Sequence, residues 1–184
     1  MSSTTMNAGT AQEALSLGEA RLYLATGAMV LGNVILPALV HSIPNGGRIF
    51  LPIFFFTLIA GWRFGIYAAL FTAVLSPLAN HFLTGMPATP MLASIIAQSA
   101  LLGVLAALAT ARGRKTTLPL LALVIAVHQL LITLPKLMEA GLQPSLAGLQ
   151  MRLPGLLFQL LGGYLVLRLL ERFLPMAGQT PREG

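Results

Sequence analysis

The chain has 184 residues, of which 56% are hydrophobic and only 9% are charged, and it carries a net charge of +6 and no cysteine. Soluble domains use about 25% charged residues, so this composition indicates an integral membrane protein. The lack of cysteine excludes disulfides, thiol chemistry and thiolate metal sites. Because no basic patch with interleaved aromatic residues occurs, we expect the positive charge to reflect membrane topology rather than nucleic-acid binding.

The two ends of the chain are polar. Residues 1–19 lack a basic segment and contain Glu13 and Glu19, so they do not resemble a cleavable signal peptide. We therefore expect a polar N-terminal tail over residues 1–19, a single membrane domain over residues 20–175 and a polar C-terminal tail over residues 176–184.

Between the tails, apolar segments follow one another at the length of membrane spans. A hydrocarbon core of about 30 Å needs roughly 20 apolar residues per helix. On that scale the segments cover residues 22–42, 49–62, 65–83, 91–111, 117–138 and 153–174. The second is short, because at about 1.5 Å per residue it covers only about 21 Å. It could be a re-entrant segment, a short crossing beside a thinned region, or a helix that continues into its loop.

The positions of the cations favour a topology in which the second segment crosses. With six crossings and the N-terminus inside, eight cations lie on the cytoplasmic side and three on the outer side, as the positive-inside tendency requires. The cytoplasmic group is Arg21, Arg63, Arg112, Arg114, Lys115, Arg168, Arg172 and Arg182, and the outer group is Arg48, Lys136 and Arg152. We therefore predict an all-α integral membrane protein with six transmembrane helices and cytoplasmic termini, in the inner (cytoplasmic) membrane.

The sequence lacks groups that would power transport or catalysis. It has no Asp, and its five acidic residues are Glu in the tails or at span ends, whereas ion-driven carriers usually place carboxylates inside the membrane. No glycine loop that could cradle a phosphate is present, so we expect no ATP hydrolysis by this chain. No nucleophile signature with a partner base occurs, so we expect neither enzyme activity nor a cofactor.

Polar residues within or beside the spans are functional candidates by default, and most of them lie toward the outer side. Gln129 and Lys136 share one helix face at a seven-residue spacing, and so do Arg152 and Gln159. We expect these groups to converge on an outward-facing small-molecule pocket with apolar walls. The substrate-binding candidates are Asn45, Arg48, Asn80, His81, Thr84, Gln129, Lys136, Arg152 and Gln159, with His128 at the floor.

Each candidate also has a structural interpretation. Lys136 and Arg152 near span ends could anchor the helices at the membrane surface, and His128 could be a core hydrogen-bonding residue. His41 and His81 lack carboxylate or cysteine support, so we predict no metal site. The three outer cations suggest a ligand with a carboxylate or phosphate group.

Small residues at helical spacing mark helix contacts in two spans. The first span contains Ala28-x-x-x-Gly32, and the fourth carries a stripe of small residues, Ala93, Ala97, Ala100, Gly103 and Ala107. Internal packing is the simpler interpretation, and docking of a separate membrane subunit is the alternative.

Several short motifs resemble those of the substrate-binding S components of energy-coupling factor (ECF) transporters. They are Gly-Gly-Arg-Ile-Phe-Leu-Pro at 46–52, Gly-Trp-Arg-Phe-Gly at 61–65, Leu-Ser-Pro-Leu at 75–78 and Leu-Thr-Gly-Met-Pro at 83–87, followed by Pro-Met at 90–91. The length and the expected topology fit that family over residues 20–175.

The resemblance implies capture of a small water-soluble vitamin or vitamin precursor at the outer face. Uptake would be energised by a separate ECF transmembrane subunit and a pair of ABC ATPases. Family members commonly meet that subunit through Ala-x-x-x-Ala in the first helix, and Ala28-x-x-x-Gly32 is the nearest match here. Two alternatives remain open from the sequence: a stand-alone membrane facilitator of a small metabolite, and a membrane scaffold subunit without a ligand.

Overall fold

The computed structural model describes residues 14–40, 52–111 and 115–174, and these ranges contain helices and no strand. The elements are α1 (Ala20–Val40), the short 3₁₀ turn η1 (Pro52–Phe54), α3 (Phe55–Phe64), α4 (Ile66–Thr84), α5 (Thr89–Thr110), α6 (Leu118–Ala140) and α7 (Leu142–Phe173).

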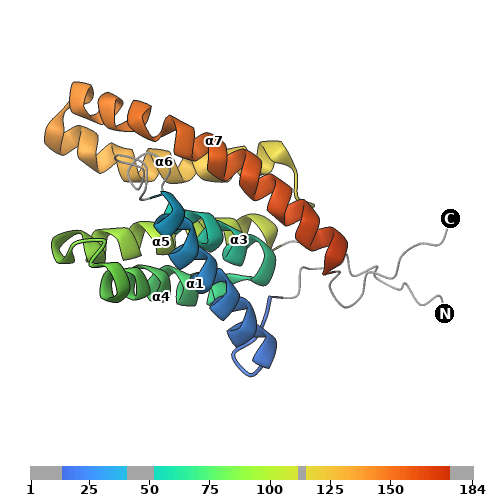
Figure 1. Cartoon of the computed structure of the whole chain (residues 1–184). Helices are drawn as coiled ribbons and strands as arrows, with labels where there is room; N and C mark the ends of the chain where they lie inside the picture. Colours follow the sequence, from blue (N-terminus) through green and yellow to red (C-terminus); the bar gives the residue numbers. More distant parts are fainter. Residues whose placement is uncertain (1–13, 41–51, 112–114, 175–184) are drawn as a thin grey trace, which may run out of the picture.

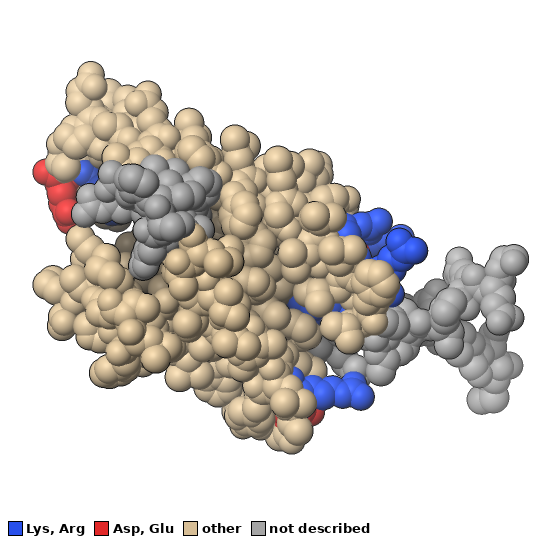
Figure 2. All heavy atoms as spheres, viewed as in Figure 1, with Lys and Arg blue, Asp and Glu red and all other residues tan. Residues whose placement is uncertain are grey.

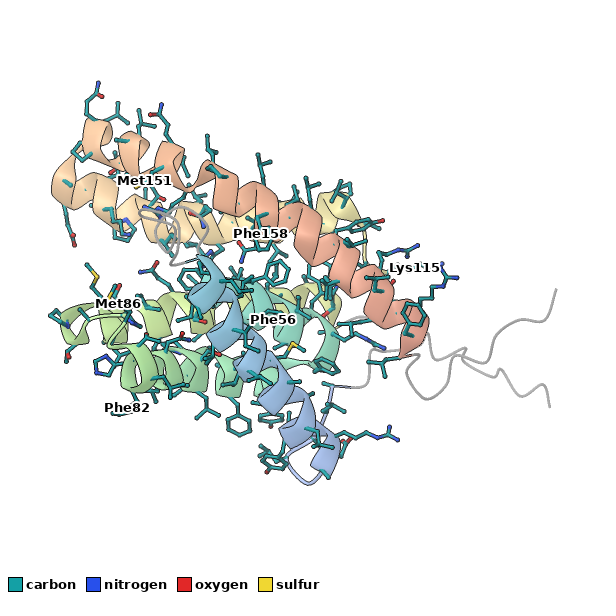
Figure 3. All side chains as sticks on the ribbon, in the orientation of Figure 1. Phe56, Phe82, Met86, Lys115, Met151 and Phe158 are labelled. Atoms are coloured by element: carbon teal, nitrogen blue, oxygen red, sulfur yellow. The ribbon has the colours of Figure 1, made fainter. Side chains whose placement is uncertain are left out.

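Within these ranges, five helices are long and apolar enough to cross a membrane, namely α1, α4, α5, α6 and α7. The segment Pro52–Phe64, formed by η1 and α3, is apolar but shorter. Large apolar side chains face outward along the long helices, among them Leu24, Leu130 and Phe82, which is 81% exposed and points away from the bundle (Figure 3). Such a surface suits lipid rather than water, so the chain is a multi-pass helical membrane protein.

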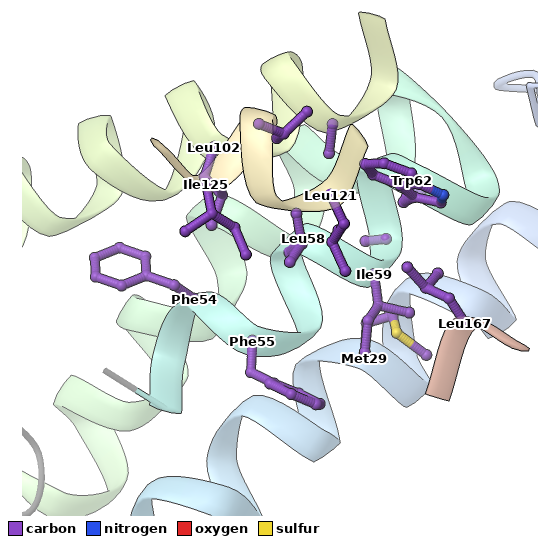
Figure 4. Close-up of a cluster of buried hydrophobic side chains, with 14 of the residues drawn as sticks. Met29, Phe54, Phe55, Leu58, Ile59, Trp62, Leu102, Leu121, Ile125 and Leu167 are labelled. Carbon is purple, nitrogen blue, oxygen red and sulfur yellow. The ribbon is translucent and has the colours of Figure 1, made fainter. Parts of the chain in front are cut away.

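The short helix α3 lies at the centre of the bundle (Figure 1) and contacts α1, α4, α5 and α7. Eight of its ten residues are buried. Phe55, Leu58, Ile59 and Trp62 pack against side chains from the surrounding helices in the core cluster of Figure 4. A helix that is apolar on every side belongs inside a bundle, so the composition of this segment explains its central position.

Glycines let α3, α4 and α5 approach one another closely. A Cβ added to Gly61 would collide with the backbone oxygen of Gly103 on α5, and a Cβ added to Gly103 would lie 2.8 Å from the Cβ of Ala69 on α4. Gly103 and Ala107 are buried, whereas Ala93 and Ala97 are exposed. The half of the α5 stripe that includes Gly103 and Ala107 therefore serves internal packing.

The predicted docking motif on α1 is divided between two environments. Ala28 is exposed, but Gly32 lies under the ring of Phe56, where an added Cβ would come within 2.6 Å of a ring carbon. Phe56 also packs edge-on against Phe55, with ring centroids 5.1 Å apart. Gly32 thus makes room for an aromatic side chain of the same chain.

A layer of hydrogen-bonded polar side chains ties four helices together. Asn33 Nδ2 on α1 donates to Thr57 Oγ1 on α3 at 3.2 Å and to Ser76 Oγ on α4 at 3.0 Å. Asn33 Oδ1 accepts from the backbone N–H of Phe56 at 3.1 Å, and Ser99 Oγ on α5 donates to Thr57 Oγ1 at 3.0 Å. Asn33, Thr57, Ser76 and Ser99 are fully buried. We call this set, together with Asn80, the polar layer.

The polar layer shows that α3 fills only part of the bundle. Thr57 lies seven residues before the end of α3, whereas Ser76 and Ser99 lie near the middle of α4 and α5. α3 therefore runs from mid-depth to one end. Toward the other end, the interior is bordered by the later halves of α4 and α6 and the early halves of α5 and α7.

Charged side chains gather at the two ends of the bundle, with a broad uncharged belt between them (Figure 2). One end holds the start of α1, the end of α3, the start of α6 and the end of α7, and we call it the cationic end. Its described cations are Arg21, Arg63, Lys115, Arg168 and Arg172. The opposite end holds the α4–α5 and α6–α7 turns, with Lys136 and Glu139 close to the latter.

The predicted start of the sixth span at residue 153 is wrong, because residues 142–152 are already helical. α6 continues to Ala140, and α7 begins at Leu142 after a break at Gly141, which has φ 82°. Pro144 falls in the first turn of α7, where its missing N–H has no helical partner and is tolerated. Arg152 consequently lies on a helix and not in a loop.

Candidate ligand site

The predicted substrate-binding residues are found at three places. Asn45 and Arg48 lie outside the described residues, as does His41. Asn80 belongs to the polar layer, and His81 and Thr84 lie at the α4–α5 turn. The remaining four are on two neighbouring helices: Gln129 and Lys136 on α6, and Arg152 and Gln159 on α7.

Asn80 is committed to helix packing. Its Nδ2 donates to the backbone oxygens of Asn33 and Ser76, both at 2.9 Å, and the residue is 3% exposed. The interaction joins α1 to α4 beside the other members of the polar layer. Its side-chain nitrogen is therefore occupied by backbone acceptors.

His81 and Thr84 shape the α4–α5 turn. His81 Nδ1 lies 2.8 Å from the carbonyl oxygen of Pro87, to which it donates. The Thr84 hydroxyl donates to the oxygen of Asn80 at 2.7 Å and accepts from the N–H of Met86 at 3.3 Å. Gly85 takes a left-handed conformation with φ 72°, which ends the helix. These contacts give His81 and Thr84 a structural role at the α4–α5 turn.

His128 connects α6 to α5 in the interior. Its Nε2 lies 3.0 Å from the carbonyl oxygen of Gln98, and because a carbonyl only accepts, Nε2 carries the hydrogen. Nδ1 is then an acceptor, and the amide nitrogen of Gln129 lies 3.5 Å from it. The ring of Phe54, at the start of the central helix, packs edge-on against His128 with centroids 6.0 Å apart. His128 is thus held in one neutral tautomer.

Two buried amides on α6 and α7 are only partly satisfied. Among the described residues, Gln129 Oε1 has no donor and Gln159 Nε2 has no acceptor, although the two residues are 7% and 3% exposed. Leu121 faces Gly163 across the antiparallel α6–α7 seam. Counting from that pair, Gln129 and Gln159 lie about one helical turn, or about 6 Å, apart in depth. An unpaired acceptor and an unpaired donor therefore occupy neighbouring levels of one seam.

Arg152 and Lys136 lie on the two helices of the same seam. Arg152 Nε donates to the oxygen of Gly148 at 2.9 Å, one turn back along α7. The guanidinium is within electrostatic range of both Lys136 and His128. Gln129, Lys136 and Arg152 therefore lie on the two helices of this seam, whereas His81 and Thr84 lie at the separate α4–α5 turn.

A groove of about 460 Å³ runs along the surface of the α6–α7 seam. Leu130 and Leu157 line it and are more than half exposed, so it opens on the outside of the bundle. Gln129 and Thr133 also belong to its wall, but the unpaired oxygens of both are buried beneath that surface. The groove itself is apolar.

The sequence reading missed the polar layer. Thr57, Ser76 and Ser99 were not recognised as a set, although each occupies the middle of the bundle. The available signal was their shared depth, together with Asn33 in the first span.

In the part of the chain that the structure describes, no three His, Asp or Glu side chains gather where they could hold a metal ion. No family model, no curated protein and no solved structure matches the chain.

Proposed function

We propose that the chain captures a small water-soluble molecule beside the α6–α7 seam, from the level at which α3 begins outward, as the S components of ECF transporters do. The observation that carries this proposal is the pair of partly satisfied amides on α6 and α7. Gln129 offers an acceptor and Gln159 offers a donor, about one turn apart in depth. A small polar molecule with one donor and one acceptor would supply the missing hydrogen bond of each amide.

The energetics favour a ligand over a scaffold role. A buried polar group without a partner costs about 1–3 kcal/mol, and lipid offers no water to supply the missing bond. A protein that only held helices together would be more stable with leucine at both positions. A capture protein recovers the cost when its ligand binds, so unpaired groups inside the membrane fit function better than packing.

The charge distribution supports an orientation. Five of the seven described cations lie at the cationic end, and the positive-inside tendency would place that end in the cytoplasm. In our proposal the chain crosses the inner membrane six times, with Pro52–Phe64 as the short crossing, and both termini are cytoplasmic. The half of the bundle beyond the start of α3 then faces outward, where a scarce nutrient such as a vitamin or its precursor is captured.

Energy would come from other subunits. The described spans contain Glu139 and Glu171 near helix ends and no carboxylate at mid-depth, and ion-driven carriers usually need one there. We propose a separate ECF transmembrane subunit and ABC ATPases as partners. Gly27 and Ala28 face outward on α1 and offer a close contact for such a subunit.

The test is to purify the protein in mild detergent from its own host, denature it, and identify released small molecules by mass spectrometry. The wild type should release a near-stoichiometric polar compound. The double variant Gln129→Leu, Gln159→Leu should release at least tenfold less, whereas Gln150→Leu, an exposed glutamine on α7, should behave as the wild type. Equal release from all three proteins would contradict the proposed site.

A second experiment separates capture from unaided transport. The identified compound is added in labelled form to liposomes that contain this chain alone. We expect binding without accumulation in the lumen. Rapid equilibration across the liposome membrane would instead favour a stand-alone facilitator.

A further inference from the structure

We infer that Arg152 and Lys136 form an anion-binding subsite of the ligand site, so that the captured molecule carries a phosphate or carboxylate group. The inference rests on the proposed function and names the chemistry of its ligand. The sequence gives three outer cations, of which Arg48 lies outside the described residues, while Lys136 and Arg152 lie on the two helices of the α6–α7 seam.

The first step is convergence across the seam. Counting from the facing pair Leu121 and Gly163, Lys136 on α6 lies level with Gly148 on α7. Arg152 turns its side chain back toward that level, because its Nε donates to the Gly148 oxygen and its Nη2 lies beside Gly148. The guanidinium and the ammonium are thereby brought into electrostatic range of one another.

The second step is the lack of a counter-charge. Among the described residues the one salt bridge joins Arg168 to Glu171, at the other end of the bundle. Glu139 is within electrostatic range of Lys136 but forms no ion pair with it. Two partly desolvated like charges repel, and a bound anion would convert this repulsion into attraction.

The third step is the geometry of the donors. Because Nε is bonded to Gly148, the two terminal nitrogens of Arg152 remain for a ligand. A guanidinium edge binds two oxygens of a carboxylate or phosphate side by side, and an ammonium adds a point charge. Gly148 lies close to this group: a Cβ at this position would be 3.2 Å from Arg152 Nη2, so the guanidinium would have to shift by a few tenths of an ångström.

Lipid phosphate is the competing source of the same chemistry. Cations near helix ends often extend toward lipid headgroups. Arg152 lies within electrostatic range of His128, which is buried against α5 and the start of the central helix. We therefore assign the anion to the ligand and let the experiment distinguish the two sources.

The experiment measures the thermal unfolding midpoint of the detergent-purified protein in sodium phosphate, sodium succinate and sodium chloride at equal ionic strength. Phosphate or succinate should raise the midpoint of the wild type relative to chloride. The apparent affinity for that anion should fall at least tenfold in Arg152→Gln and in Lys136→Gln, and the exposed side chain of Lys136 makes the second change compatible with the fold. Gly148→Val, which keeps both charges, should weaken binding as well. Arg172→Gln, at the cationic end, is the matched control and should behave as the wild type.

Several results would overturn the inference. An equal rise in all variants, or no rise with either anion, contradicts an anion subsite. A rise that appears only in nanodiscs containing anionic lipid assigns the cations to the membrane. If the protein releases a neutral or cationic compound that Arg152→Gln retains, the inference fails while the proposed capture function stands. If no compound is released and no anion stabilises the protein, both fail.

Discussion

The polar layer and the α6–α7 seam both bury polar side chains at membrane depth, but they differ in how those groups are satisfied. In the polar layer, Asn33 makes three side-chain hydrogen bonds, and its side-chain partners Thr57 and Ser76 are buried with it. In the seam, the amides of Gln129 and Gln159 each leave one group without a partner. Residues of the same chemical type therefore hold helices together in one region and remain available for binding in the other.

The comparison also separates two halves of the molecule. The polar layer marks the depth at which the central helix α3 begins to fill the bundle, and from there to the cationic end most of the core is apolar, although it also holds buried Thr26 and Thr72, whose hydroxyls have no partner among the described residues. The partly satisfied groups lie on helices that continue past that depth. Gln159 itself lies level with the start of α3, because Phe55 packs against Phe158 and Gly162 on either side of it. Packing and binding are thus assigned to different helices rather than to different levels.

The largest effect is expected for Asn33→Leu. The change leaves the N–H of Phe56 without an acceptor and removes the donor to Thr57 and Ser76. We expect a loss of about 3 kcal/mol of unfolding free energy, from one orphaned buried group and two lost bonds. Denaturant unfolding followed by fluorescence of Trp62, the single tryptophan, measures it. A loss below about 0.5 kcal/mol, the size typical of surface substitutions, would remove the distinction between the two regions.

A smaller effect is expected from a double-mutant cycle on Thr57 and Ser99. Each single change, Thr57→Val or Ser99→Ala, should destabilise the protein by about 1 kcal/mol, because interhelical hydrogen bonds in membranes are individually modest. The double variant should lose less than the sum, since both changes remove the same 3.0 Å bond. Strict additivity would mean that this bond contributes nothing to stability.

Much of the fold follows from the sequence. The apolar segments predicted at 22–42 and 65–83 correspond to α1 and α4 within two residues at each end. The short second segment, whose length was already unusual, is the central helix. The start of α7 was missed, because Pro144 and the neighbouring polar residues resemble a loop, whereas proline in a first turn is compatible with a helix.

The sequence predicts how deep each site residue lies along its span, but not how each helix is rotated about its axis. Sequence position shows how far a polar residue lies along a span, and this places Gln129 and Lys136 on α6 and Arg152 on α7. It does not show which neighbour a side chain faces. Asn80 faces α1 and is used in packing, and Gly32 faces Phe56, because the rotation of each helix is set by tertiary contacts.

The most direct test of the difference between the polar layer and the α6–α7 seam is Gln159→Leu, with ligand release and stability measured on the same preparation. The substitution removes a buried donor that has no acceptor, so the ligand-free protein should gain about 1 kcal/mol of unfolding free energy. At the same time, mass spectrometry should find at least tenfold less of the compound that the wild type releases. Loss of stability with unchanged release would contradict the account, because it would make Gln159 a packing residue like those of the polar layer.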